Sequence, residues 1–299
     1  MEGLALQLAP NKLESSYVEV LSRVGYRNIY ESYDSDIHEY LYEMERKRRP
    51  VINYIDKVQR GVTSSMRSIL IDWLVEVAGE YKLLSDTLFL SVSYIDRFLS
   101  VKPMTKSTLQ LLGVSAILIA SKYEEIDPPS VDQFCSITDN TYDKEEVIKM
   151  EASILKSLNF EMGNFTVNVF LRRFVDVASE DQNTPNLQIA FLSSYLAELS
   201  LLDYDCIGFL PSVVAASVVF LARFIISPQA HPWTSSLCEC TGYKPDDLKK
   251  CVLILHDLYF SRKAASFKAV RNKYKQQKFK CVANMSSPPY VPSVYFEDQ

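Results

Sequence analysis

Apolar positions recur with a period close to 3.6 along most of this chain of 299 residues, which contains only eight glycines. This spacing places apolar side chains on one face of a helix, so it predicts an all-α fold. Two groups of helices are expected, with a boundary near residue 162. The first group is expected at about 66–80, 86–100, 107–122 and 143–159, and the second at about 165–179, 185–203, 211–226 and 245–260.

Two further helices are expected outside these groups. One spans about 34–49 and should end at Pro50, because proline cannot continue the helical hydrogen bonds. The hydroxyls of Thr63–Ser65 are suited to cap the helix that follows. The other is a basic helix from about residue 263, before an irregular, proline-rich tail. The expected division is a short N-terminal segment at 1–32, a helix and linker at 33–65, helical units at 66–162 and 163–262, and a C-terminal helix and tail at 263–299.

The two groups of helices look like copies of one unit. Gly113–Ser121 aligns with Ala215–Arg223, and both are helices rich in small residues at the same place in their group. A repeat of a whole bundle predicts two similar domains in tandem, although chance similarity between two apolar helices would give the same match. The uncharged run Cys206–Ala222 is slightly short for a membrane span and contains Pro211. We therefore interpret it as a buried helix.

Composition and motifs argue against several classes of function. The net charge of −5 gives no overall attraction to DNA or to an anionic membrane. Six cysteines without a regular framework are typical of reduced thiols in the cytosol or nucleus. No nucleotide-binding, nucleophile-elbow or metalloprotease motif occurs. The metal-like cluster of Cys238, Cys240, Cys251 and His256 fits no common zinc spacing. The sequence therefore predicts no enzyme, no metal and no cofactor.

The predicted helix 66–80 carries more apolar surface than a surface helix needs. Two stripes run along it, one of Met66, Ile69, Leu70, Trp73 and Val77, and one of Ile71, Leu74, Val75 and Ala78. Two stripes mean either that both sides are buried or that one stripe is left exposed for a partner. Periodicity alone favours burial on both sides.

Four charged side chains lie among apolar positions. Glu151 projects from the core face of the helix at 143–159, where an unpaired carboxylate would cost several kcal/mol. Lys122 is its candidate partner, although a lysine at a helix end also complements the helix dipole. Arg67 and Asp96 are either a structural ion pair between neighbouring helices or two solvated surface charges.

Several segments resemble the cyclin family. The run Met66-Arg-Ser-Ile-Leu-Ile-Asp-Trp-Leu-Val-Glu-Val77 is very similar to the cyclin box signature. The segments Tyr94–Leu99, Ala120–Ile126 and Lys149–Leu155 continue the resemblance in the right order and spacing. Residues 34–50 resemble the helix that precedes the box in A- and B-type cyclins. Val92–Phe98 and Tyr274–Cys281 are similar to plant A-type cyclins.

The resemblance implies two five-helix cyclin folds in tandem, flanked by an N-terminal and a C-terminal helix. It implies a non-enzymatic subunit that forms a heterodimer with a cyclin-dependent kinase, activates it and controls the cell cycle in the nucleus and cytoplasm. Arg-x-Leu substrates and inhibitors are the other implied partners, with no direct nucleic acid and no membrane. Arg67 and Asp96 are implied to form a structural tie. The implied kinase-binding residues are Ile37, Lys122, Tyr123, Glu124, Glu125, Ile126, Glu151 and Phe160. The implied docking groove for Arg-x-Leu motifs consists of Met66, Ile69, Leu70, Trp73, Glu76 and Gln110.

One departure from the family concerns degradation. Cyclins of this type usually carry an R-x-x-L destruction signal in a long N-terminal region. About 32 residues precede the first expected helix here, and none of them forms that pattern. The only R-x-x-L is Arg67–Leu70, inside a core helix, so degradation by that route is not expected unless the chain is a shortened form.

Three interpretations stay open. A transcription-factor-like adaptor with tandem cyclin folds is the alternative function, which the negative charge and the lack of a CxxC pair disfavour. The basic run Arg46–Arg49 suits either a nuclear localisation signal or a basic helix end. Ser227-Pro, Ser287-Pro and Thr184-Pro are minimal proline-directed phosphorylation sites, and such dipeptides also occur by chance.

Overall fold

The computed structural model describes residues 27–180, 187–260 and 268–297. Across these ranges every regular element is a helix, and no strand forms. The chain divides into two units, Met1–Glu43 and Met44–Gln299. The first unit contributes helix α2 (Arg27–Met44), on which Ile37 and Tyr40 are exposed.

Helix α2 ends at Met44, so the expectation that it continues to Pro50 is wrong. Two of the residues that follow make long-range hydrogen bonds through their side chains. Glu45 accepts hydrogen bonds from Ser212, and Arg49 donates to the carbonyl oxygens of Ile207 and Phe209. The helix therefore ends before the proline, and the segment that follows it is held by long-range hydrogen bonds.

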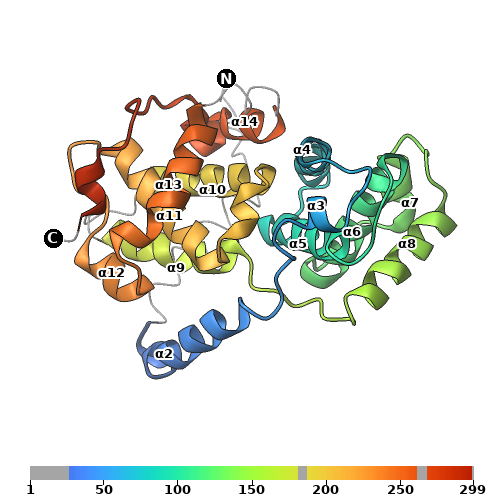
Figure 1. The fold of residues 1–299 in the computed structure, drawn as a ribbon, viewed down its shortest axis with the longest axis horizontal. Helices are drawn as coiled ribbons and strands as arrows, with labels where there is room; N and C mark the ends of the chain where they lie inside the picture. The colour runs from blue at the N-terminus through green and yellow to red at the C-terminus, as the bar shows by residue number, and fades with distance from the viewer. Residues whose placement is uncertain (1–26, 181–186, 261–267, 298–299) are drawn as a thin grey trace, which may run out of the picture. The chain divides into compact units, whose positions relative to one another are not determined.

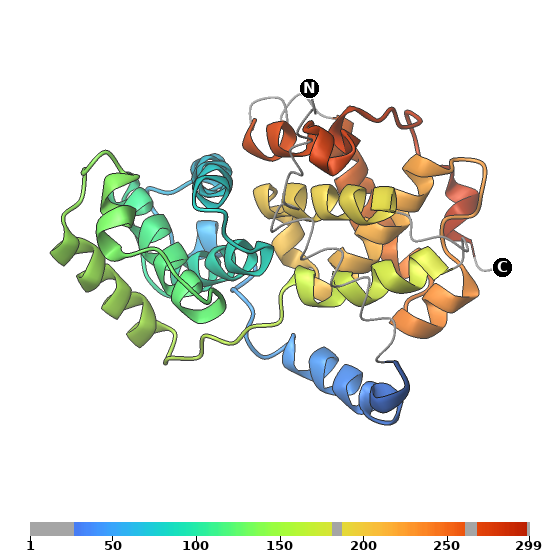
Figure 2. The ribbon, with the colours of Figure 1, turned by 180° about the vertical axis from the view of Figure 1, so that it is seen from behind.

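The second unit contains two bundles of five helices, as the tandem arrangement predicted (Figure 1; Figure 2). The first bundle consists of α4 (Ser64–Glu80), α5 (Ser85–Leu99), α6 (Leu109–Glu124), α7 (Val131–Ser136) and α8 (Lys144–Ser157). The second consists of α9 (Val167–Glu180), α10 (Leu187–Leu202), α11 (Pro211–Ile226), α12 (Ser235–Thr241) and α13 (Pro245–Phe260). The short helix α3 (Tyr54–Lys57) precedes the first bundle.

The central helices of the two bundles are α6 and α11. The aligned segments Gly113–Ser121 and Ala215–Arg223 form their middles, and every residue of the first segment is buried. Small residues allow close packing there. A Cβ atom on Gly113 would lie only 2.7 Å from Cδ1 of Leu70 on α4. The glycine therefore lets α4 and α6 approach each other closely.

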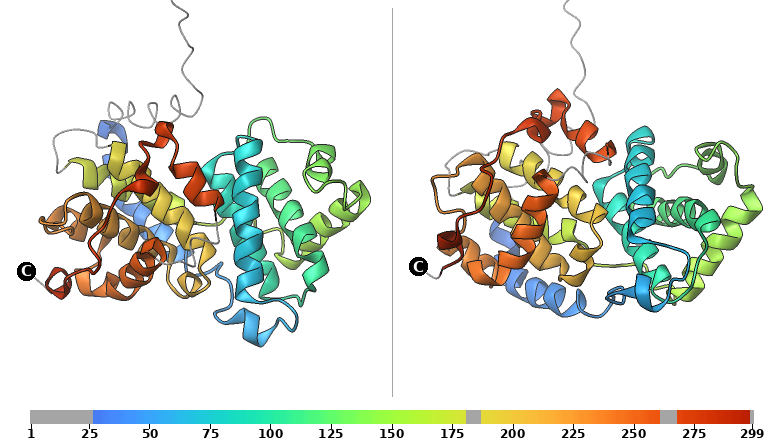
Figure 3. Two further views of the ribbon diagram at one scale, coloured as in Figure 1. Left: turned by 90° about the horizontal axis from the view of Figure 1, so that it is seen from above. Right: turned by 45° about the horizontal axis from the view of Figure 1, so that its top comes forward.

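Short elements complete the second unit. Helix α14 (Ala269–Tyr274) is part of the basic helix expected from about residue 263, and residues 261–267 lie outside the described ranges. Figure 3 shows α14 beside α4, where Asp72 accepts hydrogen bonds from the backbone N–H groups of Lys268 and Ala269, both at 3.1 Å. Three 3-10 turns follow, at Gln277–Phe279, Val282–Asn284 and Ser293–Phe296. The tail is irregular, as expected, but its Phe296 is buried.

Candidate functional site

Helix α4 presents one of its two apolar stripes partly to solvent. Thr63 caps the helix by accepting a hydrogen bond from the backbone N–H of Met66. Ile69 is 59% exposed, and Met66 and Trp73 are half-buried. Leu70 and Val77 are buried, as is the whole second stripe. The helix therefore combines a buried face with an open apolar strip.

Two polar side chains border this strip. Glu76 is exposed on α4, and Gln110 is half-buried at the start of α6. We call Met66, Ile69, Leu70, Trp73, Glu76 and Gln110 the α4 stripe. An apolar strip with one acid at its edge suits an apolar side chain next to a cation. Arg67 and Leu70, the ends of the R-x-x-L pattern, are both buried within α4.

Lys122 and Glu151 form an ion pair between the C-terminal end of α6 and the middle of α8. Their side chains meet at 2.7 Å, with that of Lys122 45% exposed and that of Glu151 14% exposed. The acid that projects from the core face of α8 therefore has the partner suggested for it. Because the lysine remains half open to solvent, the pair lies at a surface rather than inside the core.

Exposed apolar side chains lie in the segments next to this pair. Tyr123 and Ile126 follow Lys122 along the chain, and Phe160 follows the end of α8. All three are exposed, Ile126 completely. Burial and the nearby Asp86 raise the pKa of Glu124, which is half-buried. Exposed apolar groups around a charged pair are typical of a protein-binding surface.

Glu125, in the same segment as Tyr123 and Ile126, also makes hydrogen bonds within the first bundle. One of its carboxylate oxygens accepts hydrogen bonds from the backbone N–H of Leu84 at 2.7 Å and from the Thr87 hydroxyl at 2.5 Å. These donors belong to the start of α5, where backbone N–H groups lack partners within the helix. Glu125 therefore fixes the segment that carries Tyr123 and Ile126 to the bundle.

Arg67 and Asp96 form a bidentate ion pair inside the molecule. The two contacts measure 2.6 and 2.7 Å, and the Arg67 side chain is 1% exposed. Tyr54 donates a further hydrogen bond to Asp96 at 2.9 Å. Burial alone would lower the pKa of Arg67, but Asp96 raises it above its ordinary value. The arginine therefore stays charged.

The same arginine connects the two bundles. Its Nη1 donates to the carbonyl oxygen of Leu201 at 2.8 Å, and the neighbouring Ser68 hydroxyl donates to that of Leu202 at 2.6 Å. Both carbonyl groups lie at the C-terminal end of α10, where helical partners are lacking. The Arg67–Asp96 pair is thus tied to the second bundle as well as to the first.

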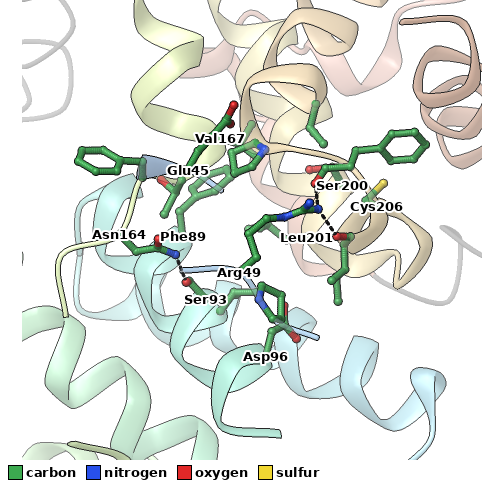
Figure 4. Close-up of a pocket in the computed structure, with 18 of the residues that line it drawn as sticks. Glu45, Arg49, Phe89, Ser93, Asp96, Asn164, Val167, Ser200, Leu201 and Cys206 are labelled. Carbon is green, nitrogen blue, oxygen red and sulfur yellow. Dashed lines mark hydrogen bonds between the residues drawn. The ribbon is translucent and has the colours of Figure 1, made fainter. Parts of the chain in front are cut away.

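A cavity of about 110 Å³ lies at this junction between the bundles (Figure 4). The segment after α2 borders it. Glu45 accepts hydrogen bonds from the backbone N–H and the hydroxyl of Ser212, at 2.9 and 2.7 Å. Arg49 reaches the carbonyl oxygens of Ile207 and Phe209, at 3.0 and 2.7 Å. Sequence reasoning missed these contacts, because they join residues more than 150 positions apart.

Two side chains of the basic run Arg46–Arg49 are therefore part of the fold. Besides Arg49, Arg48 donates to the carbonyl oxygen of Gly163 and pairs with Glu161 at 3.3 Å. Among the described residues, no group of three or more His, Cys, Asp or Glu side chains is placed to hold a metal ion. None of the described helices combines the length and apolar character needed to cross a membrane.

Comparison with protein families identifies both bundles. The profile of the cyclin N-terminal domain matches residues 36–163, and that of the cyclin C-terminal domain matches residues 165–288. The chain belongs to the cyclin family. This cyclin is 62% identical over 266 residues to putative cyclin-A3-1 of Arabidopsis thaliana, a match that covers 89% of this chain and 75% of that protein. It is 57% identical to the G2/mitotic-specific cyclin C13-1 of Daucus carota, covering 89% and 79% of the two chains.

Solved structures agree with the fold of this cyclin. The X-ray structure of a viral cyclin from herpesvirus saimiri superimposes with a TM-score of 0.64 at 22% identity, covering 73% of this chain and 95% of the viral one. The predictions of an all-α tandem cyclin fold and of similarity to plant A-type cyclins are therefore confirmed. Cyclins are regulatory subunits, so the chain is not an enzyme, and membership of the family implies a cyclin-dependent kinase as its partner.

The structure brings some of the implied site residues of this cyclin together. Lys122 pairs with Glu151, and Arg67 pairs with Asp96. Gln110 belongs to α6 and the rest of the α4 stripe to α4. Ile37 lies on α2, in the first unit.

Proposed function

We propose that this cyclin activates its kinase through the surface around Lys122 and Glu151 and recruits Arg-x-Leu substrates and inhibitors through the α4 stripe. The observation that carries the proposal is the half-open Lys122–Glu151 pair, with exposed Tyr123, Ile126 and Phe160 in the adjoining segments. Glu124, Glu125 and, on α2, Ile37 complete the proposed kinase-binding set. The cell-cycle relatives favour this function over the transcription-factor-like adaptor.

The proposed activation is a shift between two kinase conformations. The apolar side chains supply buried area, and the charged pair supplies hydrogen bonds to backbone groups of the kinase. If the cyclin binds the active placement of the kinase helix αC more tightly than the inactive one, the active population rises. That placement lets a glutamate of αC pair with the catalytic lysine, which organises the phosphates of ATP.

The α4 stripe supports a second, separate contact. Ile69 and Trp73 provide an open apolar strip for a leucine, while Glu76 attracts a neighbouring arginine. The strip lies on α4, whereas the proposed kinase surface is formed by the end of α6, the middle of α8 and the segments that follow these two helices. Substrate recruitment and kinase activation should therefore respond to different substitutions.

Action in the nucleus and cytoplasm remains part of the proposal. The basic run Arg46–Arg49 gives it little support, because Arg48 and Arg49 are engaged in the fold. A fluorescent fusion of the full chain tests it. If the wild-type protein is nuclear and the Arg46→Ala/Lys47→Ala variant remains nuclear, the nuclear localisation signal lies elsewhere in the chain. Exclusively cytoplasmic fluorescence of the wild-type protein would contradict action in the nucleus.

Glu151→Ala tests the kinase surface. The variant should lose at least about 2 kcal/mol of kinase-binding free energy, because it leaves Lys122 without its partner in the interface. Glu145→Ala is the matched control, since Glu145 lies on the same helix and forms an exposed pair with Lys149 at 3.3 Å. Kinase activity on a short substrate lacking Arg-x-Leu is measured with each full-length cyclin, together with the melting temperature. Normal activation by a folded Glu151→Ala protein would contradict the proposal.

A further inference from the structure

The tail, residues 285–297, packs over the second bundle. The ring of Phe296 stacks on that of Phe220 with 5.1 Å between centroids and 6° between planes. The ring of Tyr295 lies edge-on to that of Phe224 at 6.0 Å, and its hydroxyl donates to the carbonyl oxygen of Pro228 at 2.8 Å. The tail thus packs against two aromatic side chains of α11 that are almost fully buried.

The beginning of the tail is attached to α13 by two hydrogen bonds. The hydroxyl of Tyr259 donates to the carbonyl oxygen of Met285 at 2.5 Å. Nε2 of His256 lies 3.0 Å from the carbonyl oxygen of Pro288, which makes this nitrogen the donor. The same oxygen accepts a bond from the hydroxyl of Ser287 at 3.3 Å. Ser287 therefore sits directly at a point of attachment, and it is half-buried rather than enclosed.

The two Ser-Pro dipeptides within the described ranges differ in backbone structure. Residues 285–288, which contain Ser287, are in neither a helix nor a turn. Ser227 instead caps the C-terminal end of α11. Its backbone N–H donates to the carbonyl oxygen of Arg223, and its carbonyl oxygen accepts a hydrogen bond from the backbone N–H of Ala230. A kinase must take its acceptor segment into a cleft, which requires a helix end to unwind first. The irregular segment around Ser287 meets this requirement at much lower cost.

We propose that Ser287 is a phosphorylation site for a proline-directed Ser/Thr kinase and that the modification loosens the tail from α11 and α13. The hydroxyl oxygen attacks the γ-phosphorus of ATP, and the bond from that phosphorus to the β–γ bridging oxygen breaks. The hydroxyl proton passes to the base of the kinase, and ADP leaves. The proposal is independent of the kinase activation proposed above, because it concerns only the second bundle.

The expected loosening follows from charge and hydrogen bonding. Phosphorylation adds about two negative charges and removes the hydroxyl proton that Ser287 donates to the Pro288 carbonyl group. The phosphate oxygens then repel this carbonyl oxygen, which also holds His256. Weakening this attachment frees the tail to move away from Phe220 and Phe224.

The experiment treats the full-length cyclin with ATP and a purified proline-directed Ser/Thr kinase, and maps phosphate by mass spectrometry. Wild type, Ser287→Ala, Ser227→Ala and Ser286→Ala are compared. Ser286→Ala is the matched control, since Ser286 is exposed and adjacent but is not followed by proline. Hydrogen exchange of residues 285–297 and of α13 then measures docking of the tail. Phe296→Ala, which removes the stacked ring, shows the exchange of an undocked tail.

We expect Ser287 to be phosphorylated in the wild type and in the Ser227→Ala and Ser286→Ala variants. We expect Ser227 to be phosphorylated more slowly than Ser287. Exchange in the tail should rise by about tenfold or more and approach that of Phe296→Ala. If Ser227 were phosphorylated as fast as Ser287, or if Ser287 were not phosphorylated at all, the assignment of Ser287 as the phosphorylation site would be wrong. Full modification of Ser287 with unchanged exchange in the tail would overturn its effect.

Discussion

The central helices of the two bundles end in different surroundings. At the end of α6, Lys122 is half open to solvent and pairs with Glu151 of α8 at 2.7 Å. Near the end of α11, Phe224 is 1% exposed and lies between the rings of His256 and Tyr295. One bundle therefore exposes a charged pair where the other covers an aromatic side chain with a segment of the same chain.

Under the proposed function, this difference gives a repeated fold one binding surface rather than two. An aromatic helix end must be covered, and the tail covers it within the molecule. A charged pair at a helix end is stable in water, and it can exchange its water for hydrogen bonds to another protein. The first bundle thus leaves this place open to solvent, whereas the second covers it with the tail of the same chain.

The largest effect is expected from placing a charge at the closed end. Phe224→Lys would bury an ammonium group without a partner under the tail, so it should cost at least about 4 kcal/mol of unfolding free energy. Phe224→Leu is the control and should cost far less, since it keeps the site apolar. Urea unfolding measures both. Equal stability of the two variants would show that the covered end of α11 is not a closed core.

Arg67→Ala tests the tie between the bundles. It leaves Asp96 buried without its cation and should cost about 3–5 kcal/mol of unfolding free energy. Arg172→Ala, which removes a half-exposed pair with Asp86, is the control and should cost less than about 1 kcal/mol. If urea unfolding found both losses equally small, the Arg67–Asp96 pair would not hold the bundles together.

The sequence predicted the long helices of the two bundles well, because ten or more residues repeat the apolar period several times. Helices α3, α7 and α12 were missed, since each is too short to show that period. The partner of Glu151 was suggested by a local anomaly, a carboxylate on an apolar face. The contacts of Arg67 with Leu201 and of Glu45 with Ser212 were missed because neither has a sequence pattern. Covering of α11 by the tail was missed for the same reason.

Trp73→Ala tests the α4 stripe, which is a surface distinct from the ends of α6 and α11. Because Trp73 is only half-buried, the substitution should cost less stability than the roughly 3–5 kcal/mol of a fully buried aromatic side chain. Binding of an Arg-x-Leu peptide should weaken by about tenfold or more. Glu76→Lys should disfavour peptides with the arginine specifically. Calorimetry and peptide titration on the same samples measure both. Unchanged peptide affinity together with a large loss of stability would show that Trp73 is a core residue and not part of a docking groove.

The smallest effect concerns pH. Burial lowers the pKa of His256 below its ordinary value of 6.5, although Pro288 and Asp257 oppose this shift. Because the pKa of His256 is lower in the folded state than in the unfolded state, neutral His256 favours folding. This contribution to stability is fully present above about pH 6.5 and is lost as the pH falls through the pKa of His256 in the folded state. Protection of the tail against hydrogen exchange, measured relative to the intrinsic exchange rate at each pH, should therefore decrease on acidification, by an amount that His256→Gln reduces. An identical pH response in His256→Gln would exclude this histidine as the cause.

Hydrogen exchange of the wild-type cyclin with and without its kinase tests the central comparison most directly. The kinase should slow exchange at Ala120–Ile126 and Lys149–Leu155, on the open end of the first bundle. No change is expected in residues 285–297 over the closed end of the second bundle. Protection of the tail and of α11, with unchanged exchange around Lys122 and Glu151, would contradict the assignment of the partner surface to the first bundle.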